Sequence, residues 1–162
     1  GIDMQYKLND MVMHCREGLA TISSTTKMGD REYFVVHSAH GDGEAIYVPM
    51  ATADSIIRPV MSSSEADVLL NEIKAIEKDF NTNTKQRRDA FRRRLNSGDV
   101  KDMAFLLKQY LFYKAEPDAV KLGLADIDML QYAANFLFDE FSLSYRVERA
   151  KIEEFIVSKL IK

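Results

Sequence analysis

Residues 56–65 read IIRPVMSSSE, and the pattern of apolar residues changes within this stretch. Before Pro59 the chain is rich in β-branched and aromatic residues and is interrupted by glycine turns, which is typical of β-strands. After Pro59 the apolar residues recur at helical spacing to the end of the chain. Serines at the N-cap, Glu65 in the first turn, and Leu69 and Ile73 on one face predict that a helix begins here. The stretch therefore separates a β part from a helical part.

The β part contains four candidate strands, at residues 11–14, 19–26, 31–37 and 44–48. Turns that contain Gly and Asp separate the last three, so we expect an antiparallel meander. Pro49 has no amide hydrogen and is expected to end the fourth strand, and the ATADSI segment that follows predicts a helical turn.

The helical part predicts about five helices. They are a first over about 64–79, a basic one that ends at about Leu95, a third with an apolar stripe over 100–111, a fourth with a stripe over 127–141, and a fifth capped by Ser144. We therefore predict an α+β fold with two domains. Residues 4–61 form a small antiparallel β domain, and residues 62–162 form an all-α bundle.

Composition limits the classes of function. The 162 residues carry a net charge of −3, and no apolar run approaches the roughly 20 residues that span a bilayer. The N-terminus lacks the basic and apolar regions of a signal peptide. The single Cys15 excludes an internal disulfide. We expect a cytoplasmic protein without a membrane partner.

Few residues are suited to catalysis. The chain has neither a phosphate-binding loop nor a dinucleotide fingerprint. His37 and His40 lie near Asp42, but residues three apart on a strand point to opposite faces; the same geometry separates His14 from Cys15. We predict no catalytic residue, metal, cofactor or small-molecule substrate. A metal-dependent hydrolase that uses His37 and His40 is an alternative.

The most unusual feature is the basic segment TKQRRDAFRRRLNSGDV at residues 84–100. Within it, Lys85 to Arg94 hold six Lys or Arg against one Asp, whereas surface helices usually alternate the two signs. One explanation is that the arginines pair with acidic residues elsewhere in the chain, such as Asp79, Asp99 or Asp102. The other is binding to a polyanion, because arginine contacts phosphates through paired hydrogen bonds and displaces counterions. Such contacts specify no bases.

The order of these features resembles the CarD family of bacterial transcription regulators. The resemblance rests on YKLNDMVMHCREGLATI at 6–22, then EYFVV, IYVPM and IIRPVMS, and finally the double arginine followed by LNSGDV. It implies a Tudor-like N-terminal domain, related to that of transcription-repair coupling factor, which binds the RNA polymerase β subunit. It also implies a helical domain that contacts double-stranded promoter DNA and stabilises the open complex, and it implies that the protein is not an enzyme.

The resemblance also implies the DNA-binding candidates, which are Lys85, Arg87, Arg88, Arg92 and Arg93. In the β part we expect a partner to pair with an exposed strand edge, where alternate side chains select it. The partner-binding candidates are Lys27, Tyr33, Ala45 and Tyr47. Half-buried strand packing is an equal explanation for the two tyrosines.

Two departures from the family pattern affect these expectations. Thr84 stands where many members have a tryptophan wedge, and Tyr47 replaces an arginine of some members. The nearest aromatic, Phe91, is expected in the core. A protein-interaction module that does not bind DNA is therefore the alternative function.

Overall fold

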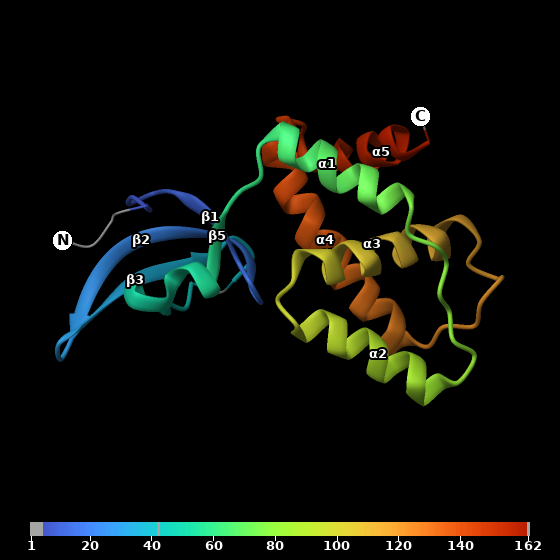
Figure 1. The fold of residues 1–162 in the computed structure, drawn as a ribbon, viewed down its shortest axis with the longest axis horizontal. Helices are drawn as coiled ribbons and strands as arrows, with labels where there is room; N and C mark the ends of the chain where they lie inside the picture. Colours follow the sequence, from blue (N-terminus) through green and yellow to red (C-terminus); the bar gives the residue numbers. More distant parts are fainter. Residues whose placement is uncertain (1–4, 42, 162) are drawn as a thin grey trace. The chain divides into compact units, whose positions relative to one another are not determined.

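The computed structural model describes residues 5–41 and 43–161, and the chain divides into two compact units, residues 1–60 and residues 61–162. The first unit is a β-sheet with a short helix, and the second consists of helices (Figure 1). The predicted α+β class is confirmed. Asp42, one part of the conceivable metal site, lies outside the described residues, as does Met4 at the predicted domain boundary.

The first unit is a five-stranded antiparallel sheet. Its elements are β1 Met11–His14, β2 Gly18–Met28, β3 Arg31–Ser38, β4 Ile46–Pro49, a 3₁₀ helix at Met50–Ser55, and β5 Ile57–Pro59. The strand order is β4-β3-β2-β1-β5. The 3₁₀ helix matches the predicted helical turn, and Pro49 ends β4 as expected.

The sequence analysis missed β5, which returns to pair with β1 at the far edge of the sheet. The four-strand meander was therefore incomplete. Pro59 is tolerated opposite Val12 because an edge strand needs hydrogen bonds on one side only.

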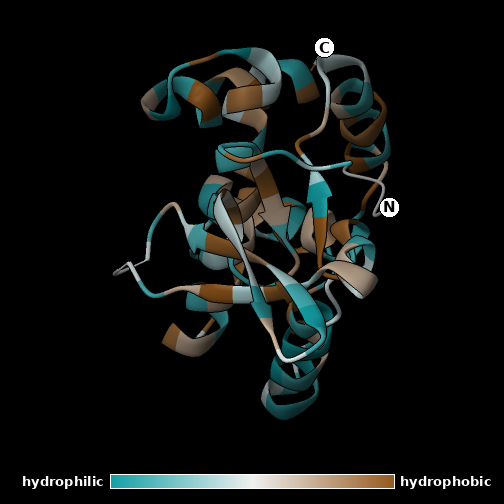
Figure 2. Ribbon diagram, turned by 90° about the vertical axis from the view of Figure 1, so that its left-hand side faces the viewer, coloured by the Kyte–Doolittle hydropathy of each residue, from teal (hydrophilic) through white to brown (hydrophobic). Residues whose placement is uncertain are grey.

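One face of the sheet forms a compact core. Val12, Ile22, Phe34 and Val48 are almost inaccessible to solvent, and the Tyr6 ring meets the Phe34 ring edge to face at 5.9 Å. The outer half of β2 is polar, in contrast to the apolar residues nearer β1 (Figure 2). The apolar half of the hairpin formed by β2 and β3 thus contributes to the core, and its polar half extends beyond the core.

The second unit contains five helices. They are α1 Ser63–Lys74, α2 Thr84–Asn96, α3 Val100–Ala115, α4 Leu124–Tyr145 and α5 Arg149–Leu160. Helix α4 contacts each of the other four, and its buried face contributes large apolar side chains such as Leu130, Leu137 and Phe141. None of the helices in the described part of the chain is both long and apolar enough to cross a bilayer.

Helix α1 begins with the expected capping box between Ser62 and Glu65 but ends at Lys74, five residues before the prediction. Contacts from α3 explain the early end. The buried Gln109 side chain accepts from the Asp79 amide at 2.9 Å and donates to the Glu77 carbonyl at 2.9 Å, which holds this segment outside a helix. The Lys108 ammonium donates to the last carbonyls of α1.

The predicted cap of the fifth helix was wrong. Ser144 lies within α4, where its hydroxyl donates to the Glu140 carbonyl at 3.1 Å. Helix α4 ends one residue later, at Tyr145, and Arg146 adopts a left-handed conformation with φ 55°. Helix α5 therefore starts only at Arg149.

Candidate nucleic-acid interface

The basic segment folds as helix α2, Thr84–Asn96, which ends one residue after the predicted end at about Leu95. Asn83 caps it, since its side-chain oxygen accepts from the Gln86 amide at 2.9 Å, and Thr84 is the first helical residue. The helix packs on α3 and α4. Its only fully buried side chains are Arg87 and Phe91, so one narrow face is turned inward.

Arg87 belongs to the buried face. Its guanidinium donates to Asp126 Oδ2 through Nε at 3.1 Å and Nη2 at 2.8 Å, and through Nη1 to the Asn81 carbonyl at 2.8 Å. Arg87 is 5% exposed and Asp126 is fully buried. A guanidinium held in this way has no free face for a phosphate, so the expectation that Arg87 contacts DNA is corrected. Its task is to join α2 to the start of α4.

Phe91 and Arg94 lie on the same inward face of α2, one and two turns after Arg87. Phe91 is 2% exposed, which confirms its predicted place in the core. Arg94 donates to Asp102 Oδ1 at 2.8 Å and lies 3.6 Å from the centre of the Phe105 ring. The first explanation of the basic segment, pairing with acidic residues elsewhere in the chain, thus holds for Arg87 and Arg94. The partner of Arg94, Asp102, is one of the three acids that the sequence analysis suggested.

The other four cations of the segment lie on the remaining surface of α2. Lys85, Arg92 and Arg93 are exposed, and Arg88 is half-buried. Lys85, Arg88 and Arg92 follow each other at helical spacing and span about 10 Å at 1.5 Å per residue. Arg92 meets Asp89 at 3.3 Å, but both side chains are about half exposed, so this pair is weak.

We call Lys85, Arg88, Arg92 and Arg93 the basic face. Because like charges on neighbouring turns destabilise a helix by about 0.2–0.5 kcal/mol per pair, the arrangement is unfavourable for the helix alone.

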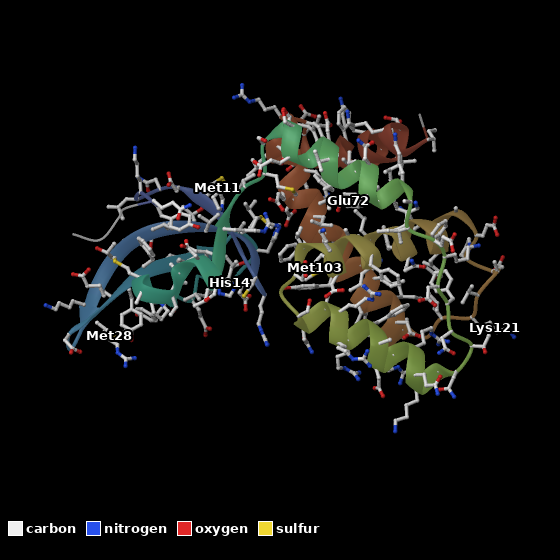
Figure 3. All side chains as sticks on the ribbon, in the orientation of Figure 1. Met11, His14, Met28, Glu72, Met103 and Lys121 are labelled. Carbon is white, nitrogen blue, oxygen red and sulfur yellow. The ribbon has the colours of Figure 1, made fainter. Side chains whose placement is uncertain are left out.

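The loop between α3 and α4 brings further residues beside the basic face. An Arg88 guanidinium nitrogen, Nη2, lies 3.6 Å from the position that a Cβ on Gly123 would occupy, and Arg88 Nε is buried without a hydrogen-bond partner in the structure described. Lys121 is exposed on the same loop and points away from the helices (Figure 3). Leu124, the first residue of α4, is 80% exposed.

The sequence analysis did not identify Lys121 or Leu124. The sequence offered only an isolated Lys and Leu around a glycine in a loop, and the approach of this loop to Arg88 depends on how α4 packs.

In the β unit, the structure places three of the four partner-binding candidates near the same edge. Tyr47 lies on the edge strand β4 and is 52% exposed, and Ala45 is exposed just before that strand. Tyr47 is opposite Val35, and Tyr33 is opposite Pro49, so the two tyrosines share one face of the sheet.

Lys27 is separated from these tyrosines. It is opposite Glu32, which directly precedes Tyr33 on β3. Because consecutive residues of a strand point to opposite faces, Lys27 lies on the face opposite to Tyr33. There it lines a hollow of about 670 Å³ beside the 3₁₀ helix. The structure does not bring Lys27 together with Tyr33 and Tyr47.

The histidines of the β unit have structural contacts. His14 is buried, and its Nδ1 accepts from the amides of Arg16 and Glu17, both at 3.1 Å. Burial lowers the pKa of His14 below 6.5, with smaller opposed effects from Glu17 and Arg16. His37 Nδ1 lies 3.2 Å from the Gly43 carbonyl. Among the residues described, no group of three or more His, Cys, Asp or Glu is placed to hold a metal ion.

Comparison with protein families matches both units. The family model described as "CarD-like/TRCF RID domain" matches residues 6–61, and the one described as "CarD, C-terminal domain" matches residues 68–157. A sheet unit of the first kind followed by a helical unit of the second defines an RNA polymerase-interacting transcription regulator. The chain belongs to the CarD family. Regulators of this family are, as a class, not enzymes.

Proposed function

We propose that this chain is a non-enzymatic bacterial transcription regulator that links RNA polymerase to promoter DNA in the cytoplasm. In this proposal, residues 4–61 form a Tudor-like domain that binds the polymerase β subunit. Residues 62–162 bind double-stranded DNA, mainly through its backbone, and modulate the stability of the open complex. Neither activity requires a metal, a cofactor or a small-molecule substrate.

The observation that carries the DNA-binding part is the division of the six cations of α2 into two sets. Arg87 and Arg94 are held by acidic partners inside the helical unit. The other four cations form the basic face, where their positive charges repel one another, and bound phosphates would relieve this repulsion. In this proposal the basic face contacts phosphates, and such contacts position the protein on DNA without reading bases.

Leu124 offers an apolar contact in place of the missing tryptophan. Thr84 is exposed at the first turn of α2 but has no ring, whereas Leu124 is an exposed apolar side chain that follows Gly123, the residue that approaches Arg88. Proteins that kink DNA from the minor groove often insert leucine at a base step. We assign this role to Leu124, at the border of the basic face.

The polymerase-binding part rests on the free edge of β4. Among the strands of the described residues, β4 pairs only with β3, so its outer edge offers backbone groups to a strand from a partner. Tyr47 and Tyr33 would then contribute apolar contact area on one face of the extended sheet. Lys27 lies on the opposite face and would contact only a partner that wraps around the hairpin.

The alternative is a protein-interaction module that does not bind DNA, in which the basic face meets an acidic protein surface. The two functions are separated by testing the full chain against purified polymerase and against promoter DNA near physiological salt. We expect binding to both. Tyr47→Glu should weaken polymerase binding, whereas Tyr132→Glu, which changes an exposed tyrosine of the helical unit, should not. Polymerase binding without measurable DNA binding would favour the alternative.

A further inference from the structure

A shallow apolar groove lies between the C-terminal parts of α3 and α5. Its volume is about 450 Å³. The apolar residues that line it are Leu111, Phe112, Ala115, Val157, Leu160 and Ile161. Val157 is 37% exposed and Ile161 is 81% exposed, so the groove presents contiguous apolar surface to solvent, which is typical of an interaction site. The groove is therefore an apolar surface that no other part of the described chain covers.

An ion pair joins the two helices that form this groove. Lys114 of α3 donates to Glu153 Oε2 of α5 at 2.5 Å, and the Tyr110 hydroxyl donates to Glu153 Oε1 at 3.5 Å. Both helices also pack on α1 and α4. The two walls are thus joined by polar contacts that lie beside the apolar lining.

Positive charge surrounds the apolar floor. The Nζ atoms of Lys78 and Lys108 lie 5.6 Å and 5.2 Å from the centre of the Phe112 ring. Lys108 also donates to the Ile73 carbonyl at 2.8 Å, and burial lowers the pKa of Lys108. Lys114 also borders the groove, but its charge is paired with Glu153, so Lys78 and Lys108 supply the positive charge beside the apolar floor.

We propose that this groove binds an acidic amphipathic helix of another protein. A helix with apolar residues at i, i+3, i+4 and i+7 fits the trough between α3 and α5, which is the usual way in which a helix binds an apolar groove. Acidic residues beside that apolar stripe would face the bordering lysines, and a basic helix would be repelled by them.

The groove and the basic face lie on opposite sides of the helical unit. Helix α5 packs on α1 and α4, and helix α2 packs on α3 and α4, with α3 and α4 between them in Figure 1. The helical unit can therefore hold DNA on one side and a second protein on the other. This inference does not depend on DNA binding, because it uses none of the residues of the basic face.

The test uses the full chain and a fluorescein-labelled synthetic helix of about 16 residues, or roughly four turns, with Leu on one stripe and Glu elsewhere. Fluorescence anisotropy should detect binding of this probe. A version with Lys in place of Glu, and a scrambled version, should not bind. Val157→Glu should weaken binding by about tenfold or more. The matched control is Val68→Glu, on the exposed side of α1, which should bind as the wild type does.

NMR provides an independent readout with the unchanged protein, so that a folding defect in one variant does not decide the result. Amide shifts on addition of the probe should concentrate at Leu111, Phe112 and Val157, and Arg88 and Arg92 should not move. The proposal is overturned if the Lys probe binds equally well, or if Val157→Glu and Val68→Glu behave alike. It is also overturned if the chain dimerises through Val157 and ignores the probe, because the groove would then belong to a second copy.

Discussion

Replacing Arg87 by alanine should destabilise the helical unit strongly and should not act mainly through DNA. Asp126 is fully buried, and the substitution removes both hydrogen bonds that its Oδ2 accepts from Arg87. Asp126 Oδ1 has no hydrogen-bond partner in the described structure, and the Gly123 amide reaches Oδ2 only at 3.4 Å. The carboxylate would therefore be left buried and almost unpaired. Breaking a buried ion pair in this way costs about 3–5 kcal/mol of unfolding free energy.

Urea denaturation of the full chain, followed by the helical circular dichroism signal, measures this loss. Two variants make the test specific. Arg93→Ala removes an exposed arginine of the same helix and should change stability by no more than about 0.5 kcal/mol. The double variant Arg87→Met with Asp126→Leu replaces the pair with apolar side chains and should recover most of the loss. A cost below about 1 kcal/mol for Arg87→Ala, or a double variant no more stable than the single one, would refute the structural role.

Three further outcomes are expected. The pKa of His14, measured by NMR titration, should lie below 6.5, and a value above 6.5 would contradict its buried position. Because the unfolded state then binds more protons than the folded state, the free energy of unfolding should fall as the pH decreases through about 6.5. Ser62→Ala should cost about 1 kcal/mol in thermal denaturation through loss of the capping box, and the adjacent Ser63→Ala should cost less; equal effects would argue against the cap. Leu124→Ala should shorten the lifetime of the open complex without changing affinity for duplex DNA, and an unchanged lifetime would exclude it as a wedge.

The inward half of α2 could have been found from the sequence alone. Phe91 was placed in the core, and Arg87 and Arg94 lie four residues before it and three after it, which is the same helical face. The spacing therefore already indicated that two of the six cations point inward. The family resemblance assigned Arg87 to DNA by its position in the basic segment, and that assignment did not consider the side of the helix on which Arg87 lies.

Other features depend on contacts between residues far apart in the sequence. The end of α1 is set by Lys108 and Gln109 of α3, more than 30 positions away. Strand β5 was missed because three residues that end in a proline carry almost no strand signal, and its pairing with β1 depends on the path through the 3₁₀ helix. The approach of Gly123 to Arg88 of α2 likewise follows from the packing of α4.

The salt dependence of DNA binding tests the central claim most directly. If the four cations of the basic face each contact one phosphate, the logarithm of the binding constant should fall with the logarithm of salt concentration with a slope of about −3.6. Arg88→Ala with Arg92→Ala should flatten this slope by about 1.8. The matched control is Lys101→Ala with Lys151→Ala, which removes the same charge from exposed positions on α3 and α5 and should keep the wild-type slope. An equal slope for both double variants would contradict the assignment of the basic face to DNA.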